Sequence, residues 1–215
     1  MLATEHWSLL ATRSLSWNEA FARAGMFLSL MSGAVVALAL VAQADNFGEG
    51  FVTFALLVLP VVLFVGLATY VRLLEINNED YVWVRGMNRL RGAYLDVDPG
   101  LRPYFITGVS EKAVDIFRTY GSTDEELQKI DWFHGFVTTP TTIAFVDAML
   151  AAALAAIIMV QVQHAMASAA LIGVVVFLLA GVALGYYGFR SQAMARIVVD
   201  ATDEARASIA DGSGE

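Results

Sequence analysis

The sequence has no cysteine and few charged residues. Without cysteine the chain can form neither disulfides nor thiolate zinc sites. Only 16% of its 215 residues are charged, against about 25% in soluble domains, which excludes an ordinary soluble globule. Only 13 residues are Lys or Arg, and the formal net charge is -8. This balance argues against nucleic acid as a partner, because phosphate binding requires a clustered basic face.

Apolar residues are abundant instead, at 58% of the chain, which excludes intrinsic disorder. Four apolar runs have about the length of 20 residues that a helix needs to cross a bilayer. They lie at residues 24–44, 51–71, 137–162 and 165–189. The first run lies too far from the N-terminus and is too long for a signal peptide. We therefore predict an all-α polytopic membrane protein with four transmembrane helices in two hairpins.

The basic residues indicate the orientation of these helices. All 13 lie before the first run, between the second and third, or after the fourth, and the short loops at 45–50 and 163–164 have none. The positive-inside rule then predicts that both termini and the segment between the hairpins are cytoplasmic.

Four regions follow from this topology. They are an N-terminal surface helix with the first hairpin (1–76), a cytoplasmic helical insert (77–136), the second hairpin (137–190), and a C-terminal helix with a disordered tail (191–215). Ser16 to Glu19 has capping-box spacing and predicts that the first transmembrane helix begins there. The preceding residues 5–15 form either a surface helix or a frayed terminus. In the insert, we expect Ser110 to cap a helix that Gly121 ends, and a second capping box to start a helix at Thr123.

Asp147 is the most informative single residue, since a carboxylate inside an apolar run costs several kcal/mol unless it is paired, protonated or hydrated. Three interpretations remain open: an ion pair that fixes helix register, an ion or proton site, or a helix boundary that leaves Asp147 near water. Candidate charge partners are Arg23, Arg72 and Arg190.

Other polar groups accompany Asp147 in the third run. Thr138, Thr141 and Thr142 precede it, and Gln161 lies two heptads after it. These side chains are candidates for an ion path, although threonines near a helix start also serve as caps. In the fourth run, Gly181, Gly185 and Gly188 form a small-residue surface suited to helix packing. We expect this surface to support a homo-oligomer.

Signatures of enzymes are absent from the sequence. It has no glycine-rich phosphate loop, no Gly-x-Ser-x-Gly elbow and no His-Glu-x-x-His pair. Asp131 and His134 have the spacing of two metal ligands, but two ligands are a weak signal. We therefore expect no catalytic activity, no metal and no cofactor.

The segments FLSLMSGAVVAL at 27–38, VRLLEIN at 71–77 and MNRLR at 87–91 resemble a family of bacterial four-span integral membrane proteins without a known activity. The resemblance covers the first hairpin and the helix after it. It implies a multi-pass protein of the bacterial inner membrane, and it brings no ligand or catalytic residue.

Two functions are compatible with these patterns. The first is an oligomeric channel or pore in the bilayer, favouring cations because the outer loops carry Asp45 and Glu49 and no basic residue. The alternative is a membrane-anchored sensor or scaffold whose cytoplasmic helices and the loop at 101–105 bind a partner protein or a small ligand.

Overall fold

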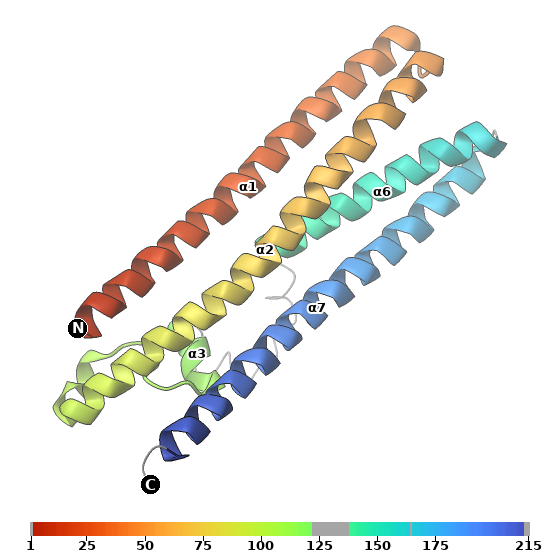
Figure 1. Ribbon diagram of the computed structural model, residues 1–215. Helices are drawn as coiled ribbons and strands as arrows, with labels where there is room; N and C mark the ends of the chain where they lie inside the picture. The colour runs from red at the N-terminus through yellow and green to blue at the C-terminus, as the bar shows by residue number, and fades with distance from the viewer. Residues whose placement is uncertain (1, 122–137, 164, 213–215) are drawn as a thin grey trace. The chain divides into compact units, whose positions relative to one another are not determined.

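The computed structural model describes residues 2–121, 138–163 and 165–212, with backbone alone at 163 and 198–212. The regular secondary structure in these ranges is helical, as predicted (Figure 1). In chain order the elements are α1 (Leu2–Asp45), α2 (Glu49–Val97), the 3-10 helix η1 (Pro99–Tyr104), α3 (Ala113–Thr119), α6 (Thr139–Gln163) and α7 (Met166–Gly212).

Four of these helices, α1, α2, α6 and α7, are long and apolar enough to cross a membrane. α1 and α2 contain the first two apolar runs of the sequence, α6 contains the third from residue 139 on, and α7 contains the fourth from residue 166 on. Pro60 lies inside α2, and the helix continues across it. Transmembrane helices tolerate such a proline because local adjustments satisfy the backbone group that it leaves unbonded.

The N-terminal part of α1 differs from the prediction. The helix begins at Leu2 and continues without a break through Ser16, so the expected helix start at Ser16 is not found. The reason lies in the contacts of this segment. Trp17 donates its indole N–H to Asp80 on α2 at 3.1 Å, and Arg13, one turn earlier, bonds the same carboxylate. These bonds hold the residues before the apolar run in helical register with it.

The turn between α1 and α2 is short and stabilised by Asp45. Asn46 and Phe47 have φ values of 48° and 60°, in the left-handed region that reverses the chain. The Asp45 carboxylate accepts a hydrogen bond from the Phe51 N–H at 2.8 Å. It thus satisfies one of the free N–H groups in the first turn of α2.

The described chain divides into two compact units. Unit 1 comprises Met1–Glu19, Glu75–Gly135 and Gln192–Glu215, and unit 2 comprises Ala20–Leu74 and Phe136–Ser191. Unit 1 has its own hydrophobic core, in which Val84 and Met87 of α2 pack with Ile116 of α3, and Leu9 of α1 packs against them.

The short helix α3 begins later than predicted. Its first residue is Ala113, because the Ser110 N–H and hydroxyl both donate to one oxygen of Asp115, at 3.0 and 2.5 Å. Ser110 therefore bonds a side chain of the helix, and its hydroxyl accepts from the N–H of Lys112, the N-cap residue, at 3.4 Å. Gly121, with φ of 90°, follows the C-terminus of α3 as expected. The helix predicted from Thr123 lies outside the described residues.

Candidate functional site

Asp147 lies on the buried face of α6 in unit 2. Pro140, Ile143 and Asp147, at spacings of three and four residues, are all buried on that face. The Asp147 side chain is 1% exposed, and neither of its carboxyl oxygens has a hydrogen-bond partner among the described residues. Buried polar groups are hydrogen-bonded in the great majority of cases. An unpartnered carboxyl at this position therefore requires an explanation.

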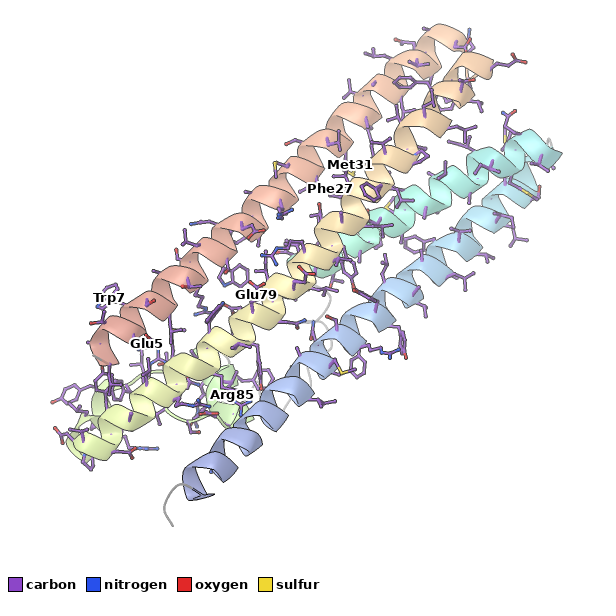
Figure 2. The ribbon with its side chains drawn as sticks, viewed as in Figure 1. Glu5, Trp7, Phe27, Met31, Glu79 and Arg85 are labelled. Atoms are coloured by element: carbon purple, nitrogen blue, oxygen red, sulfur yellow. The ribbon has the colours of Figure 1, made fainter. Side chains whose placement is uncertain are left out.

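Gly66 of α2 creates the space that the Asp147 carboxyl occupies. A Cβ atom at residue 66 would overlap Oδ1 of Asp147, and it would lie 2.8 Å from Cε2 of Phe27. Phe27, on α1, is fully buried and can be followed in Figure 2. Residues of three helices thus meet beside Gly66, and any larger residue at 66 would require the Asp147 and Phe27 side chains to shift. Sequence analysis missed Gly66, although it is the single glycine in the second apolar run.

Two hydroxyl groups lie one turn further along α2, and both are bonded to backbone carbonyls. Thr69, which is buried, donates to the Val65 carbonyl at 2.8 Å. Tyr70 donates to the Leu184 carbonyl of α7 at 2.7 Å. Neither hydroxyl donates to Asp147. These two hydroxyls therefore do not replace the missing hydrogen bonds of the carboxyl.

None of the three arginines expected to pair with Asp147 does so in the described chain. Arg23 and Arg190 are exposed and Arg72 is half-buried. Asp147 forms no ion pair with any of them in the part of the chain that the structure describes. Arg23 and Arg72 have interactions with other groups.

The threonines before Asp147 lie away from its buried face. Thr138 and Thr142 are exposed, and Thr142 donates to the Thr138 carbonyl at 3.2 Å. The hydroxyls of Thr138 and Thr141 are 2.8 Å apart. These bonds are local ones at the start of a helix. Gln161 is exposed near the other end of α6.

The three glycines of α7 have different environments. A Cβ atom at Gly188 would lie 2.6 Å from the Tyr70 hydroxyl, so this glycine provides close packing between α2 and α7. A Cβ atom at Gly181 or at Gly185 would meet no described atom within 4 Å. The apolar window of α7 is 6% buried, compared with 17%, 22% and 28% for the other three candidate spans. Much of its surface thus has no neighbour within the described chain.

Unit 1 contains a second buried carboxylate, Asp80 of α2, with a different environment. The Arg13 Nε donates to Oδ1 at 2.6 Å and the Arg13 Nη2 to Oδ2 at 3.3 Å, and Trp17 donates to Oδ1. The Arg13 guanidinium also lies 5.6 Å from the centre of the Tyr120 ring. Asp80 therefore joins α1 to α2 as a paired structural charge. Sequence analysis did not single it out, since the pairing depends on residues 63 and 67 positions away.

A neighbouring ion cluster connects α2 to the segment before α3. Arg85, labelled in Figure 2, and Arg89 both bond the Glu111 carboxylate. The hydrogen bond from Arg89 is the main cause that lowers the pKa of Glu111 to about 2, with a further contribution from Arg85, while partial burial opposes it. Asn88 lies between Arg85 and Arg89 in the sequence, and its side chain is fully buried. Its side-chain oxygen accepts a hydrogen bond from the Thr119 hydroxyl at 2.8 Å, and its side-chain N–H donates to the Ser110 carbonyl at 3.2 Å.

The metal-binding chemistry of the site is limited. Among the described side chains, those of residues 2–121, 138–162 and 165–197, no three His, Asp or Glu residues come together in a way that could hold a metal ion. Asp131 and His134 lie outside these ranges. The four apolar helices indicate a multi-pass membrane protein. No protein family, curated protein or solved structure matches the chain.

Proposed function

We propose that this chain is a multi-pass protein of the bacterial inner membrane that assembles into a cation-conducting oligomer, with Asp147 as its cation-binding group. In this proposal α1 with α2 and α6 with α7 form two transmembrane hairpins. Both termini and the helical insert between the hairpins are cytoplasmic, as the distribution of the 13 basic residues favours. No catalytic step, metal or cofactor is part of it.

The observation that carries the proposal is the Asp147 carboxyl, buried and without a partner inside a helix that can cross the bilayer. An acid used only to fix helix register would be expected to have a basic or hydrogen-bonding partner, as Asp80 has. Intramembrane acids without a structural partner are typical of ion and proton pathways. The negative charge that Asp147 can carry selects for cations over anions.

Assembly is the second element of the proposal, because four helices enclose little space on their own. The exposed surface of α7 around Gly181 and Gly185 supports it, since small residues allow close approach of helices within lipid. The partners proposed here are therefore the lipid bilayer and further copies of the same chain.

Reconstitution of the purified chain into liposomes tests conduction. We expect cation flux above that of empty vesicles, and we expect Asp147→Asn to abolish most of it. Asp96→Asn makes the same chemical change at an exposed residue and should leave the flux unchanged. Wild-type vesicles that are no more permeable than empty ones would contradict the proposal.

The mass of the solubilised particle, measured by light scattering and corrected for detergent, tests assembly. A ring of about four to six chains is expected if the helices enclose a pore. A monomer would contradict the pore, because the proposal requires several chains to enclose it.

A second function, a membrane-anchored sensor or scaffold, is supported by a different observation in unit 1. Val97, Tyr104 and Ile106, at and around η1, are between 79% and 95% exposed. Exposed apolar groups of this kind are suited to binding a partner protein. Photo-crosslinking from residue 106 in cells tests this function. A cross-linked partner that is lost in Tyr104→Ser supports it, and products that contain only this chain contradict it.

A further inference from the structure

We infer that the cation bound by Asp147 is a proton, held on the carboxyl group as a neutral acid between Gly66 of α2 and Phe27 of α1. This inference rests on the proposed function and specifies its ligand. Binding forms one O–H bond at a carboxyl oxygen and changes no other bond, and release returns the proton and leaves the carboxylate.

The first argument is the cost of the ionised form. A carboxylate removed from water is strongly disfavoured unless donors or a countercharge replace its hydration. Asp147 is 1% exposed and has no donor among the described residues. The neutral acid avoids this cost, because it carries no net charge. Burial without a partner thus favours the protonated group.

The second argument is that Asp147 belongs to no group of three His, Asp or Glu side chains that could hold a metal ion among the described residues. Divalent cations take six or more oxygens, and monovalent cations in channels are held by rings of carbonyl oxygens. The space beside Gly66 is shared by the Asp147 carboxyl and by the Cε2 carbon of Phe27, which lies 2.8 Å from where a Cβ at residue 66 would be. The nearby Thr69 hydroxyl donates to a carbonyl. A proton needs a single oxygen, which this site provides.

Other titratable groups do not interfere with this assignment. Asp147 is the only ionisable side chain in α6. Among the described residues, the others in unit 2 are Arg23 and Asp45 on α1, Glu49, Tyr70 and Arg72 on α2, and Tyr186, Tyr187 and Arg190 on α7. None of these groups forms a hydrogen bond or an ion pair with Asp147. The proton on Asp147 is therefore held by the environment of the carboxyl itself.

Infrared difference spectroscopy on the full-length protein in liposomes tests the inference directly. The spectrum of the wild type minus that of Asp147→Asn, recorded near neutral pH, should contain the carbonyl stretch of one neutral carboxylic acid per chain. The matched control is Asp45→Asn, which removes an exposed aspartate that accepts a backbone hydrogen bond. Its difference spectrum should contain the stretches of an ionised carboxylate instead.

Two results would overturn the inference. In one, the Asp147→Asn difference contains only carboxylate stretches near neutral pH, which means that the group is ionised. In the other, the neutral-acid band disappears when Na⁺ or K⁺ is added at constant pH, which means that a metal cation competes for the site.

The spectra also separate this inference from the proposed function, because they require no transport. A neutral-acid band in a protein that conducts nothing would support the proton site and contradict the conduction. Cation flux through a protein whose Asp147 is ionised would support the conduction and contradict the proton site.

Discussion

Two buried aspartates, one in each unit, differ in almost every respect except burial. Asp80 is 2% exposed and Asp147 is 1% exposed. Asp80 accepts hydrogen bonds from Arg13 and Trp17, whereas Asp147 accepts none from the described residues. Burial alone therefore does not indicate what a carboxyl group does. The hydrogen-bond donors around the two carboxyl groups distinguish them: Asp80 is a paired ion, and Asp147 has no partner among the described residues.

Removing each carboxyl should give the largest difference between the two units. We expect Asp80→Ala to lower the stability of the protein by about 3 kcal/mol or more, because it leaves the Arg13 charge and the Trp17 N–H without their acceptor. Asp147→Asn should change it by less than about 1 kcal/mol, since no partner among the described residues loses a bond. Thermal unfolding in detergent measures both. Equal losses for the two variants would show that Asp147 is also a structural ion.

A substitution at Gly66 should test how tightly the Asp147 carboxyl is packed, with a smaller effect on stability than Asp80→Ala. Gly66→Ala places a methyl group where Oδ1 of Asp147 lies, and overpacking of this kind costs about 1 to 3 kcal/mol. The double variant Gly66→Ala with Asp147→Ala should recover much of that loss, because the carboxyl is removed. The two sites would then show strong energetic coupling.

The matched control for this cycle is Gly181→Ala. Its Cβ meets no described atom within 4 Å, so it should leave the unfolding temperature almost unchanged or raise it slightly, since alanine favours helix. If Gly66→Ala behaves like this control, the close contact between α2 and α6 does not exist in the membrane.

The four apolar helices, and an acidic side chain at residue 147 within one of them, could be predicted from sequence, because run length and an isolated charge are local properties. Gly66 could not be predicted, since its role depends on which residue of α2 lies opposite Asp147. For the same reason, the arginine partners of Asp147 were predicted wrongly. Arg23, Arg72 and Arg190 were chosen by depth along the helices, and the structure places none of them against the carboxyl. The start at Ser16 failed because Arg13 and Trp17 bond a residue far along the chain.

Removing the Glu111 carboxylate, which is paired but partly exposed, should have the smallest effect on stability. Its pKa is lowered from 4.5 to about 2, chiefly by the Arg89 hydrogen bond. The folded pKa lies below that of the unfolded chain, so the stability it contributes is complete above about pH 4.5 and is lost as the pH falls toward 2. Partly exposed ion pairs contribute at most about 1 kcal/mol.

The pH dependence of unfolding, followed by tryptophan fluorescence, measures this contribution. The difference in stability between the wild type and Glu111→Gln should shrink over that acidic range. A difference that stays constant with pH would show that the arginines do not bond Glu111.

The contact between Tyr70 and Gly188 has a consequence for the evolution of this chain. The tyrosine hydroxyl occupies the space that a side chain at residue 188 would need, and it bonds the Leu184 carbonyl of the same helix. The two positions should therefore covary in homologous sequences. Homologues with alanine or a larger residue at 188 should have lost the tyrosine at 70, and those that keep the tyrosine should keep glycine opposite it.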